Sequence, residues 1–210
     1  MNNRLRIAIT KGRLLDKSVQ LFERAGLDCG PIKDPGRRLI HSVPNYPLDA
    51  VLAKAPDVIT YVEHGVCDLG IVGKDTILEK GGAFYEVLDL GFGKCRFALA
   101  VKEGSDFYGT YKTRRIASKY PEVTRAFFEK KGMDVDIIKI EGSVELAPIL
   151  ELTDAIVDIV ETGATLKANG LVPIETVADV SARLIVNTAS MKLYKNQIND
   201  FIAKCERELG

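Results

Sequence analysis

The sequence has 210 residues, 46% of them hydrophobic, with 29 basic and 29 acidic side chains. This length and apolar content are enough to bury the core of one large domain or of two small ones. The balance of charge provides no basic surface for nucleic acid or for an anionic membrane, so we expect neither as a partner.

No apolar run approaches the roughly 18 residues of a membrane span, and residues 1–6 lead straight into a strand rather than into a signal sequence. We therefore expect a cytoplasmic protein. The four cysteines are scattered, with no Cys-x-x-Cys pair and only two histidines. This pattern indicates neither a zinc site nor a disulfide framework.

The first predicted elements are a buried strand at residues 5–9 and an amphipathic helix, joined by a turn that carries Lys11, Gly12 and Arg13. In open α/β sheets the carboxyl end of a strand faces the ligand crevice, so Lys11 and Arg13 are candidates for binding an anion. A solvated turn is the alternative interpretation. Arg37 follows in a loop, where an exposed charge is the default interpretation.

A short helix is predicted at residues 57–63 and a buried strand at 68–73, with Lys74 and Asp75 at the carboxyl end of that strand. This second charged turn is placed like the first. Further elements are then expected: a helix at 76–80, strands at 87–90 and 97–101, and a polar loop at 102–113.

A second series of alternating elements comprises a strand at 116–117, a helix at 121–131, a strand at 135–140, a helix at 144–150, strands at 174–177 and 183–187, and a helix at 195–209. Glu141 precedes the helix at 144–150, which makes that helix start another potential site for an anion or a hydroxyl group. The apolar face of the last helix is expected in the core.

The alternation of strands and helices predicts an α/β fold with mostly parallel sheets in two lobes. We expect residues 1–93 and 184–210 to form lobe I and residues 94–183 to form lobe II, with the chain crossing between them twice. Ligand sites in such a design lie between the lobes.

Residues 154–166 are the most informative stretch. A strand from Ala155 to Val160 breaks at Thr162-Gly163, and a helix follows through Leu166. Gly163 can adopt a positive φ and admits a ligand close to the backbone, and threonine hydroxyls lie beside the free N–H groups of the helix start. Such a turn is suited to hold a phosphate group.

Asp154 and Asp158 have the same parity in the predicted strand, so their side chains point to one face, with Glu161 close by. Carboxylates do not bind phosphate, but they suit ribose hydroxyls or a hydrated Mg²⁺ ion. A Thr-Gly turn also occurs in α/β proteins without a ligand. The acidic face needs a reason on an apolar strand, and it favours a sugar phosphate.

Seven motifs occur in one order along the chain: Lys11-Gly-Arg13, Thr60-Tyr-Val-Glu-His-Gly65, Asp68-Leu-Gly-Ile-Val-Gly-Lys-Asp75, Asp89-Leu-Gly-Phe-Gly-Lys94, Ser143-Val-Glu-Leu-Ala-Pro148, Asp154 to Leu166, and Arg183-Leu-Ile-Val-Asn187. With these motifs, essentially the whole chain resembles the short form of ATP phosphoribosyltransferase, the first enzyme of histidine biosynthesis. The resemblance implies a fold of the type II periplasmic-binding-protein kind, with two crossover strands.

The resemblance also implies the chemistry: N1 of the adenine of ATP is joined to C1 of 5-phosphoribosyl 1-pyrophosphate, with Mg²⁺ carried mainly by the pyrophosphate groups of the substrates. It implies that Glu161, Thr162, Gly163, Ala164, Thr165 and Leu166 hold the 5-phosphate, that Asp154 and Asp158 face the ribose, and that Arg13 and Arg37 contact the leaving pyrophosphate beside Lys11 and Gly12. For adenine we assign Glu63, Gly73, Lys74 and Asp75, and we add Glu141 to the substrate-binding residues.

In the short-form family the catalytic chains pair as dimers within a hetero-octamer, together with a regulatory subunit similar to histidyl-tRNA synthetase, and the resemblance implies the same here. The chain departs from the family pattern at Glu151 and Thr153, where small residues are usual, and at Lys54 and Ile59. Two other functions are open at this stage: a ligand-sensing or solute-binding module with the same fold, and a catalytically dead paralogue.

Overall fold

The structure, a computed structural model, describes residues 4–109 and 112–209. The chain divides into two compact units: unit 1 comprises Met1–Gly93 and Ser181–Gly210, and unit 2 comprises Lys94–Val180. The sequence placed the return to the first lobe at residue 184. The structure places it at Ser181, because the strand Ala182–Asn187 pairs along its whole length with strands of unit 1.

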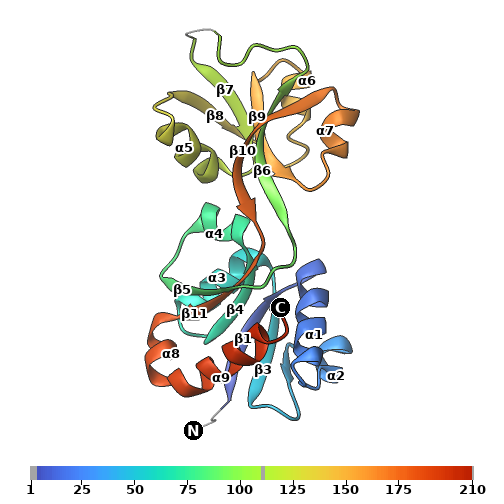
Figure 1. The fold of residues 1–210 in the computed structure, drawn as a ribbon, viewed down its shortest axis with the longest axis vertical. Coiled ribbons are helices and arrows are strands. Elements are labelled where there is room, and N and C mark those ends of the chain that lie inside the picture. Colours follow the sequence, from blue (N-terminus) through green and yellow to red (C-terminus); the bar gives the residue numbers. More distant parts are fainter. Residues whose placement is uncertain (1–3, 110–111, 210) are drawn as a thin grey trace. The chain divides into compact units, whose positions relative to one another are not determined.

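The described strands of unit 1 are β1 (Leu5–Thr10), β2 (Ile40–Ser42), β3 (Leu48–Ala53), β4 (Leu69–Gly73), β5 (Phe84–Asp89) and β11 (Ala182–Asn187), and its helices are α1 (Arg13–Arg24), α2 (Gly30–Lys33), α3 (Ala55–Glu63), α4 (Lys74–Lys80), α8 (Thr188–Leu193) and α9 (Lys195–Glu206). The strands form one sheet in the order β2-β3-β1-β4-β11-β5 (Figure 1). β1, β3 and β4 are parallel, whereas β2 and β11 run antiparallel to their neighbours.

Helices cover both faces of the unit 1 sheet, so its central strands are buried on both sides. Alternate residues of β1 pack into different cores: Ile7 and Ile9 join Phe22 of α1 and Phe201 of α9, while Ala8 joins the core beneath α3. This double burial explains why Ile7, Ala8 and Ile9 are apolar without alternation.

The described elements of unit 2 are β6 (Cys95–Lys102), β7 (Arg114–Ser118), α5 (Pro121–Lys130), β8 (Val135–Lys139), α6 (Leu146–Ile149), β9 (Ala155–Val160), α7 (Ala164–Ala168) and β10 (Leu171–Val180). The sheet order is β10-β6-β9-β7-β8, and β6 runs antiparallel to both of its neighbours. α5 lies on one face of the sheet, and α6 and α7 lie on the other (Figure 1). β7 is parallel to both β8 and β9, so the carboxyl ends of these three strands lie at the same end of the sheet.

The last helix, α9, packs against unit 1, as its apolar pattern predicts. Ile198, Phe201 and Cys205 are buried, and the rings of Phe22 and Phe201 meet edge to face with their centroids 5.5 Å apart. Such aromatic pairs add to the free energy gained by burying the rings. The prediction that this face belongs to the core is confirmed.

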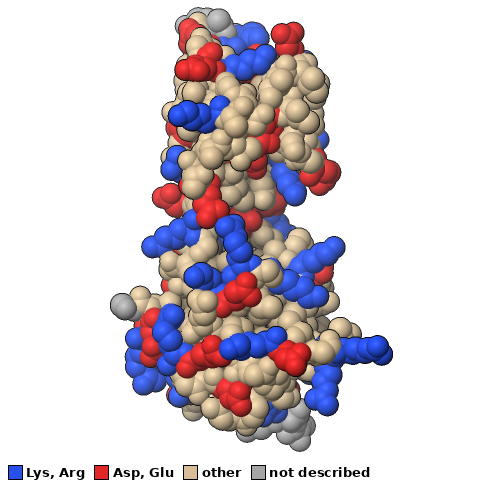
Figure 2. Space-filling model, turned by 90° about the vertical axis from the view of Figure 1, so that its right-hand side faces the viewer, with Lys and Arg blue, Asp and Glu red and all other residues tan. Residues whose placement is uncertain are grey.

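Acidic and basic side chains are interspersed over the face shown in Figure 2. No helix within residues 4–109 and 112–209 is long and apolar enough to cross a membrane.

Candidate active site

The turn between β9 and α7 has the geometry that its sequence predicts. β9 ends at Val160 and α7 begins at Ala164. Gly163 lies just before α7 with φ 78° and ψ 3°, in the left-handed region that glycine adopts without steric cost. The prediction that this glycine supplies a positive φ is confirmed.

The start of α7 offers backbone donors, because the first N–H groups of an α-helix have no partner within the helix. The Ala164 N–H donates to the Thr162 hydroxyl over 3.3 Å, and the Lys167 N–H donates to the Gly163 carbonyl over 3.0 Å. The first of these bonds is long for its type, so an anion can compete for the Ala164 N–H group.

A pocket of about 260 Å³ lies at this turn. It brings together the predicted residues Asp158, Glu161, Thr162, Gly163, Ala164, Thr165 and Leu166, together with Glu145. The side chain of Leu166 is buried in the core beneath α6 and α7, so this residue can offer a ligand only its backbone.

Sequence reasoning missed two charged residues near this pocket. Glu145 lies just before α6 and lines the pocket with Asp158. Lys119 follows β7 directly, and its charge acts on both Asp158 and Glu141. The signal for Lys119 was present, since the rule that selected Lys11 and Lys74 at strand ends applies equally to this residue.

Asp158 is half-buried near the carboxyl end of β9. Burial raises the pKa of its carboxyl group, and the negative charge of Glu145 raises it further. The Ile159 N–H and the Lys119 charge partly oppose this shift. The folded protein thus holds two carboxyl groups close together where hydroxyl donors of a ligand would relieve their desolvation.

Asp154 is not part of this pocket, which corrects the prediction that both aspartates face one ligand. It precedes β9, and the four residue steps from Asp154 to Asp158 span about 13 Å in an extended strand. Its carboxylate accepts hydrogen bonds from the Arg115 N–H at 2.9 Å and from Lys112 Nζ at 2.7 Å. Although burial alone would raise it, these bonds hold the pKa of Asp154 below its usual range.

Glu141 lies just beyond β8, at the same end of the unit 2 sheet as the pocket, but it does not line the pocket. It is exposed and pairs with Lys139 over 2.8 Å. This bond, together with the charges of Lys139 and Lys119, lowers the pKa of Glu141. A direct contact between Glu141 and a ligand in the pocket is not supported by this position.

Lys11, Gly12 and Arg13 form an exposed turn at the carboxyl end of β1. The Lys11 N–H donates to Ala53 O over 3.0 Å, which joins the turn to the end of β3. Gly12 has φ 85°, a value that other residues rarely adopt. The turn therefore presents its two cations at the end of a parallel strand, as predicted.

Arg37 lies in the exposed loop before β2. Ile40, the first residue of β2, pairs with Val51 near the carboxyl end of β3. Because β3 lies between β2 and β1 and is parallel to β1, the loop and the turn after β1 both lie at the carboxyl ends of the parallel strands.

β4 is joined to α4 at this same end of the sheet, through Gly73, Lys74 and Asp75. Lys74 pairs with Glu86 over 2.5 Å. A Cβ atom on Gly73 would overlap the Asp75 carboxylate. Burial raises the pKa of Asp75, while its own N–H and that of Thr76 donate to the carboxylate and limit the shift.

Glu63 lies near the amino ends of the parallel strands, whereas Gly73 lies at the carboxyl end of β4. This corrects the grouping of Glu63 with residues 73–75. α3 begins just after β3 and runs back along the sheet for nine residues, or roughly 13 Å. Its last residue, Glu63, accepts a hydrogen bond from the Ala83 N–H at 3.2 Å, just before the start of β5. The two segments therefore cannot grip one adenine together.

Comparisons with known proteins identify the family of this chain. The family model described as ATP phosphoribosyltransferase matches residues 54–207. An ATP phosphoribosyltransferase of Clostridium kluyveri is 58% identical over 207 residues, which cover 99% of this chain and 94% of that protein. The chain belongs to the ATP phosphoribosyltransferase family. It is therefore a pentosyltransferase, and the first step of histidine biosynthesis is the function of this family.

Solved structures agree with the membership of the ATP phosphoribosyltransferase family. A chain of the ATP phosphoribosyl transferase (HisG:HisZ) complex from Thermotoga maritima matches with a TM-score of 0.82 and 32% identity, covering 98% of both chains. The periplasmic aliphatic sulphonate binding protein SsuA from Escherichia coli matches with a TM-score of 0.59 and 15% identity, covering 98% of this chain and 72% of that chain. The second likeness shows the fold alone, and the predicted fold class is confirmed.

Proposed function

We propose that this chain transfers the phosphoribosyl group of 5-phosphoribosyl 1-pyrophosphate to N1 of ATP, and that it holds the pentose phosphate at the turn between β9 and α7. The observation that supports this placement is the pocket lined by the start of α7, by Thr162 and Thr165, and by three acidic residues, Glu145, Asp158 and Glu161. Few ligands other than a phosphorylated sugar satisfy both halves of that lining.

The 5-phosphate accepts hydrogen bonds from the N–H groups at the start of α7 and from the hydroxyls of Thr162 and Thr165. Gly163 has no side chain, so the phosphate can approach the backbone closely. Glu161 lies at the exposed rim of the turn. Its main chain, rather than its carboxylate, faces the phosphate in this arrangement, because like charges repel.

Asp158 and Glu145 accept hydrogen bonds from the ribose hydroxyls. This assignment replaces the earlier pairing of Asp158 with Asp154, whose carboxylate is held by Arg115 and Lys112. Burial and the charge of Glu145 raise the pKa of Asp158, so additional hydrogen-bond donors would stabilise its ionised form. Ribose hydroxyls supply such donors.

Arg13 and Arg37, with Lys11, stabilise the leaving pyrophosphate. The bond from C1 to the pyrophosphate oxygen breaks, its electron pair departs with the leaving group, and a bond from adenine N1 to C1 forms. Negative charge therefore builds on pyrophosphate while the sugar becomes oxocarbenium-like, and fixed cations lower the free energy of this state. Adenine N1 carries no proton, so the step needs orientation rather than a general base.

We assign Gly73, Lys74 and Asp75 to the binding of ATP, because they lie at the same end of the unit 1 sheet as Lys11 and Arg13. Mg²⁺ enters with the pyrophosphate groups of the substrates. Across residues 4–109 and 112–209 no group of three His, Cys, Asp or Glu side chains is arranged to hold a metal ion. The donors that suit Mg²⁺ are then substrate oxygens and water.

We further propose that the chain works in the cytoplasm as a homodimer, within a hetero-octamer that contains a HisZ-like regulatory subunit similar to histidyl-tRNA synthetase. The support is the structural likeness to a chain of a HisG:HisZ complex. Substrates for this assembly are ATP and 5-phosphoribosyl 1-pyrophosphate.

The test is to incubate the purified chain with ATP, 5-phosphoribosyl 1-pyrophosphate and Mg²⁺, alone and with a HisZ-like subunit, and to quantify pyrophosphate and a phosphoribosyl-ATP adduct. We expect the two products in equal amounts, and neither when one substrate is omitted. Binding of both substrates without either product, with and without the partner, would contradict the proposed function.

A further inference from the structure

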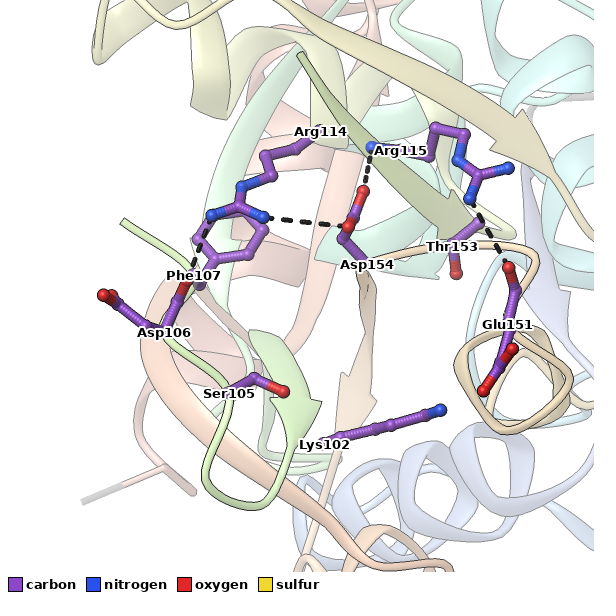
Figure 3. Close-up of a pocket in the computed structure, with 9 residues that line it drawn as sticks. All are labelled: Lys102, Ser105, Asp106, Phe107, Arg114, Arg115, Glu151, Thr153 and Asp154. Atoms are coloured by element: carbon purple, nitrogen blue, oxygen red, sulfur yellow. Dashed lines mark hydrogen bonds and ion pairs between the residues drawn. The ribbon is translucent and has the colours of Figure 1, made fainter. Parts of the chain in front are cut away.

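A second pocket, of about 230 Å³, lies in unit 2 at the starts of β7 and β9 (Figure 3). Because β7 and β9 are parallel, this pocket lies at the amino ends of the strands, whereas the turn between β9 and α7 lies at their carboxyl ends. Its walls include Lys102 at the end of β6, Arg114 and Arg115 at the start of β7, and Thr153 before β9. The transfer reaction proposed above uses none of these side chains.

Arg114 carries a buried charge that the protein only partly satisfies. The residue is 7% exposed, and its guanidinium lies 5.3 Å from the centroid of the Phe107 ring. Nη2 donates to Asp106 O over 3.0 Å, while Nη1 is 3.7 Å from the Asp154 carboxylate, too far for a hydrogen bond. Nε is buried and has no hydrogen-bond partner in the described part of the chain.

Thr153 adds a second unsatisfied donor. The residue is 5% exposed, and among the described residues its hydroxyl oxygen has no hydrogen-bond partner. Figure 3 shows this oxygen directed into the space bounded by Asp154, Lys102 and Glu151. Buried polar groups nearly always have a partner, so two such groups around one pocket indicate a ligand that supplies acceptors.

The carboxylates near the pocket are largely committed elsewhere. Asp154 accepts from Lys112 and from the Arg115 N–H, and Asp106 accepts from the Gly109 N–H over 2.8 Å. Glu151 is exposed at the rim.

Within the described part of the chain, by contrast, no side-chain cation that lines the pocket lies within hydrogen-bonding distance of a carboxylate. Among the described residues, the Arg115 guanidinium donates to a single acceptor, the backbone carbonyl of Glu151, over 3.4 Å. Lys102 forms no ion pair with any residue that the structure describes. Together with Arg114, three cations therefore lie around one cavity with unused donors.

We propose that this pocket binds a small oxyanion, a phosphate or a carboxylate group. Arginine guanidinium and threonine hydroxyl donors match oxygen acceptors, and bonds to an ionised acceptor are about twice as strong as neutral ones. The cavity is smaller than the roughly 300–1,000 Å³ of pockets for drug-sized ligands, so it suits a small anion or the anionic end of a flexible molecule.

NMR spectroscopy of the full chain tests the proposal, because the Arg114 Nε–H group gives its own signal. Sodium phosphate and sodium acetate are titrated separately, at ionic strength held constant with sodium chloride. We expect a saturable shift of the Arg114 Nε–H signal and of the Thr153 amide signal with at least one of the two anions. Phosphate alone, acetate alone, or both then identifies the class of anion.

Matched variants show that the response comes from this pocket. Thr153→Val and Lys102→Met are each expected to weaken the affinity about tenfold, the effect of losing roughly one hydrogen bond to a charged group. Glu151→Gln removes a carboxylate at the rim and is expected to tighten binding. Lys130→Met removes an exposed lysine of α5 in the same unit and is expected to change nothing.

The Gly163 amide signal reports separately on phosphate bound at the turn before α7. A shift of Gly163 without any saturable shift of Arg114 would overturn the proposal. Equal affinities in the wild type, Thr153→Val and Lys102→Met would overturn it as well. Either result would leave the proposed transferase function intact.

Discussion

Asp154 and Asp158 stand four positions apart, the first just before β9 and the second within it, yet folding shifts their pKa values in opposite directions. Asp154 is held by the Lys112 ammonium and the Arg115 N–H, so its ionised form is stabilised. Asp158 is desolvated beside Glu145, so its ionised form is disfavoured. A charge that costs stability within a pocket is a mark of function rather than of folding.

Asp158→Asn is expected to raise the melting temperature at pH 7.5. The pKa of Asp158 is raised by folding, so this group contributes stability while it is protonated, and that contribution is lost as pH rises through its folded pKa. The gain from the variant should therefore shrink as pH falls toward about 4. The same variant should lower kcat/KM for 5-phosphoribosyl 1-pyrophosphate about tenfold or more. Thermal unfolding and steady-state kinetics measure both, and a variant that is less stable at pH 7.5 would refute this view of Asp158.

Asp154→Asn is expected to do the reverse. The pKa of Asp154 is lowered in the folded state, so this group contributes stability above its unfolded pKa and loses that contribution as pH falls through its folded pKa. We expect a loss of about 1–2 kcal/mol at pH 7.5, because a partly buried bond to a charged group is removed. Denaturant unfolding at pH 7.5 and near pH 3 measures this loss, which should be smaller at the lower pH; an equal loss at both would count against it.

Arg13→Ala is expected to lower kcat about a hundredfold while KM for ATP changes by less than about threefold, because the charge that Arg13 meets develops at the leaving group. Lys17→Ala, which removes an exposed cation from the same helix, serves as the control. Initial rates of pyrophosphate release measure both variants. An unchanged kcat in Arg13→Ala would remove this residue from the mechanism.

At the scale of elements, the turn between β9 and α7 depends on a glycine. Gly163 and Gly132 both have positive φ values, 78° and 63°, and both lie in unit 2. A side chain at either position strains the backbone by about 1–2 kcal/mol. Only the first of the two lies in the pocket proposed for the sugar phosphate.

Gly163→Val is expected to weaken the binding of 5-phosphoribosyl 1-pyrophosphate at least about tenfold, since it crowds the turn, whereas Gly132→Val should bind with the affinity of the wild type despite similar strain. Isothermal titration calorimetry of the two variants checks the difference. Equal affinities in both would mean that the phosphate does not approach this turn.

Local patterns predicted the elements that carry local signals. The Thr162-Gly163 break located the turn, and the apolar spacing of α9 located its core face. β3 was missed, because Asp49 interrupts its apolar run; the fold buries this carboxylate by pairing it with Arg4 over 2.8 Å. Such a partner lies far away in the sequence, so no local pattern announces it.

Distance within an element explains the two errors about the site. Parity in a strand tells which face a side chain takes but not how far along the strand it lies, and this misplaced Asp154. In the same way α3 carries Glu63 to the edge of the sheet opposite Gly73. The sequence also indicated a ligand site at the start of the helix at 144–150, but it selected Glu141 there, whereas Glu145 is the residue that lines the pocket.

At the scale of the whole molecule, each unit carries charged residues at the carboxyl ends of its parallel strands, and the residues differ between the units. The described cations of unit 1 at its parallel strand ends are suited to a leaving pyrophosphate, and the pocket of unit 2 is suited to a pentose phosphate. The family resemblance implied this division, and the rule that ligands bind where parallel strands end had already selected Lys11 and Arg13 as candidates for binding an anion. The opposite edge of unit 2 holds the second anion pocket, which no motif had indicated.

The most direct measurement is a crystal structure of the protein soaked with 5-phosphoribosyl 1-pyrophosphate and Mg²⁺. We predict that the oxygens of the 5-phosphate lie about 2.7–3.2 Å from the backbone nitrogens at the start of α7, with the ribose hydroxyls donating to Asp158 and Glu145. Density for the sugar phosphate at any other place, with the turn at Gly163 empty, would contradict this account.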